Sequence, residues 1–239
     1  MAMKGYAQFC PVAAASEVFA QRWTPLVLRE LFAGASHFNE IRRGLPLMSA
    51  TLLARRLRAL EESGVVSSEC PPGQTRAAYR VTPAGEEFRP IVQGLGVWGQ
   101  RWAARFEPRN LDAEFLMWNI RRRIAIERLP ARRLVMRFEF TGLPAGYRRA
   151  RVFWLLSEPG EIDLCLKDPG AEVDLEVRAD IQCFARVWLG DLAFSAASRK
   201  GSIRVTGRRE LVRAFPGWLL RSPFAAVARP AMANVAGGS

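Results

Sequence analysis

The sequence is poor in the side chains on which most catalysis and metal binding depend. It has one histidine, His37, and its four cysteines, at positions 10, 70, 165 and 183, form no Cys-x-x-Cys pair. A histidine and cysteine metal site is therefore not expected, and a single histidine supports no plausible Ser–His–Asp set. Gly-rich phosphate loops of the P-loop or Rossmann type are also missing. We expect no metal, no cofactor and no enzymatic activity.

Long apolar runs are missing as well. No segment approaches the roughly 18 apolar residues that a membrane-spanning helix needs. The N-terminus lacks the charged region, apolar core and cleavage site of a secretion signal, so we expect a cytoplasmic protein. Apolar residues still make up 49% of the 239, enough for sizeable cores, and the length favours two domains. The formal charge of +12 favours a polyanionic partner without establishing one.

The most informative stretch is residues 49–82, SATLLARRLRALEESGVVSSECPPGQTRAAYRVT. Ser49 suits a helix N-cap, and Gly64 suits the left-handed conformation that ends many helices. Between them, leucines recur at spacings of four and three and give one apolar stripe. Two strand-like runs follow, separated by a Pro-Pro-Gly turn. The stretch predicts a recognition helix over 49–63 and a β-wing whose loop covers residues 70–77.

The predicted helix carries a basic face away from its leucines. A major groove admits a helix, and arginine can donate two hydrogen bonds to guanine O6 and N7. Residues near the start of such a helix usually reach the bases. The alternative is an ordinary solvated helix face. The predicted DNA contacts are Ser49, Thr51, Arg55, Arg56 and Arg58 on the helix, Arg76 on the wing, and His37, Arg42 and Arg43 on the preceding helix.

Shorter helices are predicted before this stretch. Pro11 suits a first helical turn, and one apolar helix face is expected to include Val12, Ala15, Phe19 and Trp23. A second helix is expected over 26–33, and a third begins at Ser36 or His37. Residues 36–63 then form a helix-turn-helix and residues 65–81 the wing.

Taken together, residues 6–105 resemble the HxlR-type winged helix-turn-helix regulators of bacteria, a MarR-related group. The matching pieces are Cys10-Pro11-Val12, Arg22-Trp23-Thr24, Leu28-Arg29-Glu30-Leu31, Phe38-Asn39-Glu40-Ile41, the LxxRLRxLEExG run over 52–64, and the YRVTPAG run over 79–85. The resemblance implies a homodimeric transcription factor that binds double-stranded DNA. Arg55 departs from the family pattern, because a glutamate often stands there, so no operator sequence is carried over.

A dimerisation helix is predicted after the wing. Thr82 can cap a helix with Pro83 at its first position. Apolar residues then follow at intervals of three and four, as in a coiled-coil seam: Phe88, Ile91, Leu95, Trp98 and Trp102. Glycines in this segment disfavour a helix, but they allow two helices to approach each other closely. The alternative is that this helix packs within its own subunit.

Cys10 is the one cysteine with a candidate chemical role. Its position at a helix start would lower the pKa of the thiol, and some HxlR-like regulators sense oxidants or electrophiles with a cysteine there. The alternative is a small packing and capping residue. If the Cys10→Ser variant still released DNA in response to oxidant as wild type does, the sensing hypothesis would be excluded.

A second domain is predicted over 107–230, after a first over 1–106 and before a flexible tail over 231–239. A helix from Asp112 through Leu129 precedes strands at 134–140, 151–157, 161–166 and 173–177. Helices at 181–189 and 192–197, a strand at 202–206 and a last helix follow. Strands followed by helices indicate an α+β layer: an antiparallel or mixed sheet covered by helices. Residues 121–151 hold ten arginines and two glutamates, which could assist DNA binding or form an ordinary basic surface.

Residues 110–225 resemble the sterol-carrier-protein-like domain. The resemblance rests on the VDLEV run from 173, Trp188-Leu189-Gly190-Asp191, and the SRKGSIRVTGRRELVRAF run. It implies an apolar tunnel between sheet and helices that binds a lipid-like molecule, although a fold does not transfer a ligand. Each candidate wall residue could equally fill a core; the candidates are Phe153, Trp154, Phe184, Trp188, Phe194, Phe215 and Trp218.

Two functions are compatible with these features. The first is a dimeric DNA-binding transcriptional regulator whose second domain responds to a hydrophobic small molecule. The second is a lipid-binding or carrier protein whose winged helix serves protein interaction or dimerisation. The arginines of the recognition helix and Arg76 favour the first.

Overall fold

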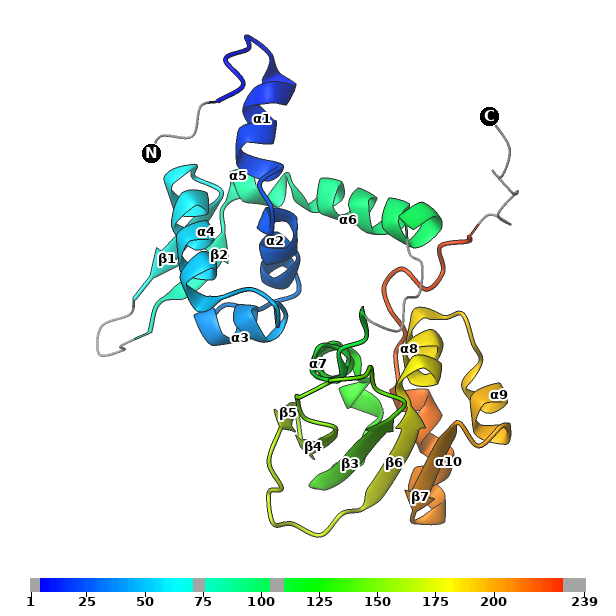
Figure 1. Cartoon of the computed structure of the whole chain (residues 1–239). Helices are drawn as coiled ribbons and strands as arrows, with labels where there is room; N and C mark the ends of the chain where they lie inside the picture. Colours follow the sequence, from blue (N-terminus) through cyan, green and yellow to red (C-terminus); the bar gives the residue numbers. More distant parts are fainter. Residues whose placement is uncertain (1–4, 71–75, 104–109, 230–239) are drawn as a thin grey trace, which may run out of the picture. The chain divides into compact units, whose positions relative to one another are not determined.

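The computed structural model describes residues 5–70, 76–103 and 110–229 (Figure 1). The chain divides into two compact units, Met1–Gly96 and Val97–Ser239. The predicted boundary at residues 106–107 and the predicted tail over 231–239 lie outside the described residues. Within the described ranges, no helix is both long enough and apolar enough to cross a membrane.

The first unit is a helical domain with a small two-stranded sheet. Its core is formed by residues from the first helices, the turn after them and the longest helix, and seven of these are almost fully buried: Val27, Leu28, Ile41, Leu45, Leu53, Leu57 and Leu60. Its elements are α1 (Pro11–Phe19), α2 (Thr24–Phe32), α3 (Phe38–Arg43), α4 (Ala50–Glu62), β1 (Val66–Glu69), β2 (Ala78–Val81), α5 (Pro83–Glu86) and most of α6 (Arg89–Trp98), whose last two residues lie past the boundary at Gly96.

The predicted apolar face running from Val12 to Trp23 is wrong. Helix α1 ends at Phe19, the Val12 side chain is 73% exposed, and Trp23 has a left-handed φ of 78° at the N-cap of α2. Pro25 explains the break, because a proline fits the first turn of a new helix and cannot continue an old one. A left-handed backbone at a bulky residue costs about 1–2 kcal/mol, which the packing of α2 offsets.

The single helix expected between Thr82 and Trp102 is also wrong. Thr82 caps α5 as predicted, accepting a hydrogen bond from the Gly85 amide at 3.1 Å. Helix α5 ends at Glu86, and α6 is followed by a π-helix, η1 (Gly99–Ala103). Pro90 accounts for the first break, because its ring would clash with the carbonyl four residues earlier in a continuous helix.

The second unit is an α+β domain around a five-stranded mixed sheet, as predicted. The strands lie in the order β5-β4-β3-β6-β7; β3 and β6 are parallel and the other neighbours are antiparallel. The elements are α7 (Ala113–Arg123), a 3-10 turn η3 (Ile126–Arg128), β3 (Leu134–Thr141), β4 (Val152–Glu158), β5 (Glu161–Cys165), β6 (Leu175–Asp180), α8 (Ile181–Leu189), α9 (Phe194–Arg199), β7 (Ile203–Gly207) and α10 (Arg209–Trp218).

The core of this unit lies between the sheet and its helices. Alternate residues of β3 point to one face, and Phe138 there contacts Phe184 of α8 and Phe215 of α10, with ring centroids 6.3 and 6.0 Å apart. The inward residues of α7 join the same core, namely Leu116, Met117 and Ile120. Helix α9 contributes Ala197 to it as well, so helices α7, α8, α9 and α10 all pack into this core.

Two predicted boundaries in this unit need correction. The first helix ends at Arg123, not Leu129, because Ile124 turns to an extended conformation and pairs with Leu219, while the Ala125 amide donates to the Trp218 carbonyl at 2.8 Å. The helix expected from residue 192 begins instead at Phe194. The first error comes from a contact between distant parts of the chain, which local patterns do not contain. The second reflects local hydrogen bonds, because the Asp191 and Leu192 amides still donate to the Arg186 carbonyl of α8.

Candidate nucleic-acid interface

Helix α4 has the placement expected of a recognition helix. The Ser49 side chain accepts a hydrogen bond from the Leu52 amide at 3.2 Å and so caps the helix as predicted. Three leucines at spacings of four and three, Leu53, Leu57 and Leu60, are at most 1% exposed. Burying such side chains contributes about 2 kcal/mol each. The helix is thereby anchored by one face and leaves the opposite face free.

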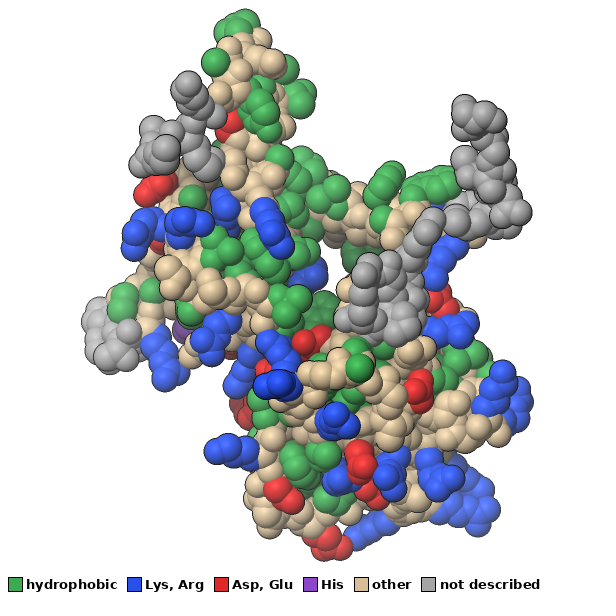
Figure 2. All heavy atoms as spheres, in the orientation of Figure 1, with side chains coloured by type: hydrophobic (Ala, Val, Ile, Leu, Met, Phe, Trp, Pro, Cys, Tyr) green, Lys and Arg blue, Asp and Glu red, His purple; other side chains and the backbone are tan. Residues whose placement is uncertain are grey.

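That opposite face is basic and lacks acidic partners. Thr51, Arg55 and Arg58 follow each other at spacings of four and three, which places them on one side of the helix, and all three side chains are exposed. Among the described residues, neither arginine has an ion pair or a side-chain hydrogen bond. Basic side chains gather over this part of the first unit in Figure 2. Both guanidinium groups are available to an external anion.

Arg56 sits between the buried and the outward face. Its side chain is half-buried, and its Nε atom has no hydrogen-bond partner in the described structure. Burial lowers the pKa of Arg56, and the neighbouring Arg55 cation lowers it further. A nearby anion would relieve both effects, because it would supply an acceptor and a compensating charge.

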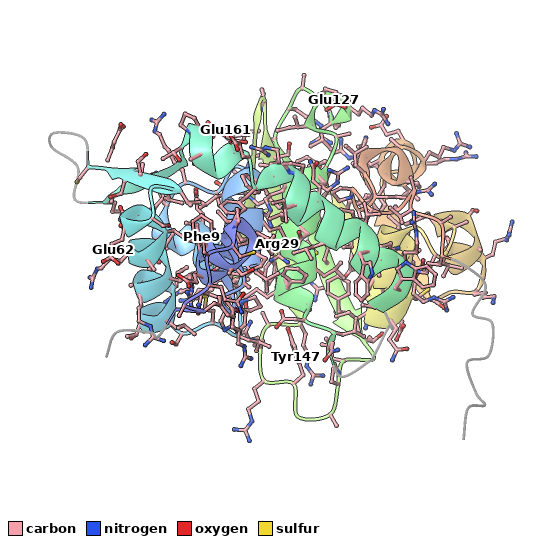
Figure 3. All side chains as sticks on the ribbon, turned by 90° about the horizontal axis from the view of Figure 1, so that it is seen from above. Phe9, Arg29, Glu62, Glu127, Tyr147 and Glu161 are labelled. Carbon is pink, nitrogen blue, oxygen red and sulfur yellow. The ribbon has the colours of Figure 1, made fainter. Side chains whose placement is uncertain are left out.

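An ion pair within α2 is linked by a hydrogen bond to the turn before α4 and ties these parts of the helix-turn-helix together. The Glu30 side chain is fully buried and lies 2.7 Å from the Arg29 guanidinium, which also donates to the Gly44 carbonyl at 2.9 Å. A Cβ atom on Gly44 would overlap the Glu30 carboxylate. This residue must therefore be glycine for α3 and α4 to keep their distance from α2. Figure 3 labels Arg29.

In the sequence, Leu28-Arg29-Glu30-Leu31 was interpreted only as a family match, and the ion pair between Arg29 and Glu30 was not predicted. The spacing does predict that Glu30 lies on the buried face of the helix. Glu30 follows Val27 by three residues and Leu31 follows it by four, which are the spacings of one helix face. A carboxylate on a buried face requires a partner, and the preceding arginine was the obvious candidate.

The base of the wing is tied to the start of α3. Strands β1 and β2 are antiparallel, with Val66 opposite Val81. The Tyr79 amide donates to the Ser36 carbonyl at 2.7 Å, and the His37 Nδ1 atom lies 3.3 Å from the Ala77 carbonyl oxygen. His37, predicted as a DNA contact, is half-buried and takes part in this link.

The other predicted contacts lie at exposed positions. Arg76 is exposed just before β2, and Arg42 and Arg43 are exposed at the end of α3. Wing residues 71–75, which include the predicted Pro-Pro-Gly turn, lie outside the described residues. The described basic residues thus come from three neighbouring elements: the end of α3, the outward face of α4 and the return arm of the wing.

Helix α6 carries an exposed apolar stripe and buries none of its residues. Ile91, Leu95 and Trp98 are 48%, 47% and 59% exposed, and Trp102 of η1 is 58% exposed. Phe88, the first member of the predicted dimerisation seam, stacks on Phe19 of α1 with ring centroids 5.0 Å apart. It is therefore used within its own chain, while the remaining four stay uncovered.

The second unit has a small apolar hollow of about 110 Å³. Three of the seven predicted wall residues line it, Phe184, Trp188 and Phe194. The other residues that line it are Ile120, Val187, Leu192, Pro216, Leu219, Leu220 and Arg221. The Trp188 Nε1 atom is buried and has no partner among the described residues.

The other four predicted wall residues lie elsewhere. Phe153, Phe215 and Trp218 are at most 2% exposed and belong to the filled core. Trp154 follows Phe153 along β4 and points to the opposite face of the sheet.

Cys10 is a free, half-buried thiol at the N-cap of α1, and its side chain makes no capping hydrogen bond. The oxidant-sensing hypothesis stays a prediction. Within the described residues, no three His, Cys, Asp or Glu side chains are close enough to hold a metal ion.

Comparisons with known proteins match the first unit. Residues 18–107 match the HxlR-like helix-turn-helix family. The HTH-type transcriptional regulator YvaP of Bacillus subtilis is 32% identical over 107 residues, which cover 44% of this chain and 96% of the relative. A regulator of the same type from Methanothermobacter thermautotrophicus is 34% identical over 41% of this chain and 76% of its own. The reduced form of the transcriptional regulator YodB from B. subtilis is 28% identical with a TM-score of 0.35, covering 40% of this chain and 95% of that one.

Proposed function

Because the chain belongs to the HxlR-like helix-turn-helix family, we propose that it is a dimeric transcriptional regulator that binds duplex DNA through α4 and the wing. One observation carries this proposal: Thr51, Arg55 and Arg58 share an exposed face of α4 without acidic partners, opposite a fully buried leucine stripe. A free basic face on a rigidly anchored helix suits a major groove, where arginine reads guanine.

The other basic residues suit the phosphate backbone. Arg76 on the wing and Arg42 at the end of α3 are exposed, and the half-buried Arg56 has an unpartnered Nε atom. Contacts with phosphates position a protein on DNA but carry no sequence information. We therefore assign base reading to the exposed face of α4 and backbone binding to these three residues.

Footprinting of the full chain across its own upstream region tests this function. We expect two protected half-sites about one helical turn apart, because a two-fold dimer places two recognition helices in successive major grooves. The absence of any protected site, together with no measurable binding to duplex DNA, would contradict a regulatory function. It would then favour a lipid-carrier role in which the winged helix binds protein.

We propose that the exposed stripe of α6 and η1 is the dimer interface. Its four apolar side chains are about half exposed, and uncovered patches of this kind mark interaction surfaces. We expect Trp98→Glu to shift the protein to a monomer in analytical ultracentrifugation and to weaken binding to a two-half-site duplex at least tenfold. Its matched control is Gln93→Glu, which adds the same charge on the other side of α6. If Trp98→Glu remained dimeric, the interface would lie elsewhere.

We further propose that the hollow in the second unit binds a hydrophobic effector. The residues that line it are apolar except for Arg221, and Trp188, whose indole N–H has no partner in the described structure, is among them. Apolar side chains with a few polar groups are typical of ligand sites. The hollow is small, so it would hold one short apolar group or the end of a longer chain.

Filling the hollow tests the effector proposal. Cell lipid extract is expected to alter the footprint of the wild-type protein, and Leu192→Trp to abolish that response, because the indole would occupy the hollow. Affinity for DNA without extract should stay within about twofold. Leu166→Trp, at an exposed position, is the control. A response of Leu192→Trp equal to that of wild type would exclude the hollow as the effector site.

A further inference from the structure

The second unit carries a concentration of exposed cations that its own structure does not use. They lie within the SRKGSIRVTGRRELVR run over α9, β7 and the start of α10: Arg199, Lys200, Arg204, Arg208, Arg209 and Arg213. In the described part of the chain, none of the six has an ion pair or a side-chain hydrogen bond. The one acidic residue of the run is Glu210.

The arginine-rich stretch over 121–151 behaves differently, although it looks more basic in the sequence. Most of its arginines have partners within the second unit. Arg123 donates to the Arg221 carbonyl at 2.6 Å, and Arg132 pairs with Asp174 at 2.9 Å. Arg137, whose side chain is a quarter exposed, pairs with two glutamates of the sheet. These arginines hold the unit together, whereas the six cations over 199–213 remain available to an external anion.

The six cations also sit where local physical chemistry disfavours them. Arg208 is the N-cap of α10 and Arg209 its first residue, next to the positive end of the helix dipole. Arg213 is four residues after Arg209, a spacing at which like charges destabilise a helix. Arg204 faces Arg178 across the β6–β7 pair, where like charges are again unfavourable. Glu139 pairs with Arg178 at 3.0 Å and Glu210 lies in the first turn of α10, but no acidic side chain pairs with any of the six cations in the described structure. Unfavourable local choices of this kind indicate a functional requirement.

The surface is open and partly concave. Strand β7 is an edge strand. A hollow of about 250 Å³ beside it is lined by Arg178, Arg204 and one acidic residue, Asp180, together with Thr141, Ala179, Gly201 and Ser202. Figure 2 shows basic side chains gathered over the α9, β7 and α10 part of the second unit, and Figure 3 shows nitrogen-tipped side chains extending outward from it. Guanidinium groups at such a surface suit phosphate oxygens, which they bind through paired hydrogen bonds.

We propose that this basic surface, residues 199–213, binds the sugar–phosphate backbone of duplex DNA beside the operator. The inference rests on the proposed function. Once α4 is bound, the second unit is held near the same duplex, so even weak phosphate contacts form at a high effective concentration. The contacts are sequence-independent, since phosphates carry no base information. The surface extends the DNA length that the protein covers without changing the sequence that it reads.

The test compares the full-length protein with Arg209→Gln/Arg213→Gln on two duplexes, the minimal footprinted operator and the same operator extended by two helical turns on each side. Wild type should bind the extended duplex more tightly, with a steeper dependence on salt. The variant should lose this difference, with the logarithmic salt slope falling by about 0.9 for each phosphate contact removed. Its affinity for the minimal operator should be unchanged and its Tm unchanged or higher, because a like-charge helix pair is removed.

A charge-matched control separates a local contact from a general effect of net charge. Arg148→Gln/Arg151→Gln removes two exposed arginines that have no ion pair in the described structure and should keep the length dependence. Equal losses in both variants, or no length dependence in wild type, would overturn the inference. The inference would also be overturned if Arg209→Gln/Arg213→Gln bound both duplexes as wild type does but no longer bound phosphatidylglycerol vesicles. Failure of wild type to bind any duplex would instead contradict the proposed function itself.

Discussion

Replacing Arg29 with alanine is expected to destabilise the first unit by about 3–5 kcal/mol, because it leaves the fully buried Glu30 carboxylate without its ion-pair partner. The same change removes the hydrogen bond to the Gly44 carbonyl at the turn before α4. An unpaired charge in the interior is costly since the desolvation of that charge is no longer compensated. The recognition helix should therefore lose its fixed position before the rest of the chain unfolds.

Native-state hydrogen exchange of the α4 amides measures this effect best, because a chain of two units need not unfold in one step. Glu30→Gln should cost less than Arg29→Ala, since it keeps the shape of the side chain and removes the buried charge. Arg42→Ala serves as the control at an exposed position and should stay within about 0.5 kcal/mol of wild type. If Arg29→Ala left the exchange rates of the α4 amides unchanged, the Arg29–Glu30 pair would not be what fixes α4 in the helix-turn-helix.

The second large effect is expected at the DNA-binding face. Arg55→Ala should weaken binding to the natural operator by about 1–3 kcal/mol, the usual contribution of a bidentate contact with a base. It should also flatten the preference among duplexes that differ at one base pair, because the side chain that discriminates there has been removed. A panel of singly substituted duplexes, titrated at one salt concentration, measures both quantities.

Two further variants help to interpret the Arg55 result. Arg76→Ala should weaken binding to all duplexes by similar amounts and reduce the salt slope by about 1, as expected for a phosphate contact. Arg186→Ala, at an exposed position of α8 in the second unit, controls for loss of one positive charge. If Arg55→Ala weakened every duplex equally, Arg55 would bind the backbone and another residue would read the base.

Local patterns predicted the elements whose causes are local. Helix α4 follows from its Ser49 cap, its leucine stripe and the glycine after it, and the structure confirms all three. The strands of the second unit were predicted because alternating apolar residues and glycine or proline turns lie close together in the sequence. The α+β class followed from their order.

The errors and omissions have long-range or backbone causes. The left-handed Trp23 and the break before Pro90 depend on single prolines inside otherwise helical patterns. The end of α7 depends on Ile124 pairing with Leu219. Arginine roles were the hardest to predict, because Arg123 and Arg132 find partners 98 and 42 residues away. Composition therefore pointed to 121–151 as the basic surface, whereas most arginines there have partners and the six cations over 199–213 have none in the described part of the chain.

The most direct test of the central claim, that α4 and the wing bind duplex DNA, is a salt titration of the full-length protein with its footprinted operator. The logarithm of the binding constant should fall linearly with the logarithm of salt concentration, with a slope of about −0.9 for each phosphate contacted. Arg55→Ala/Arg58→Ala should bind the operator no better than a random duplex. An operator affinity that does not fall as salt rises, or that Arg55→Ala/Arg58→Ala leaves unchanged, would contradict the account.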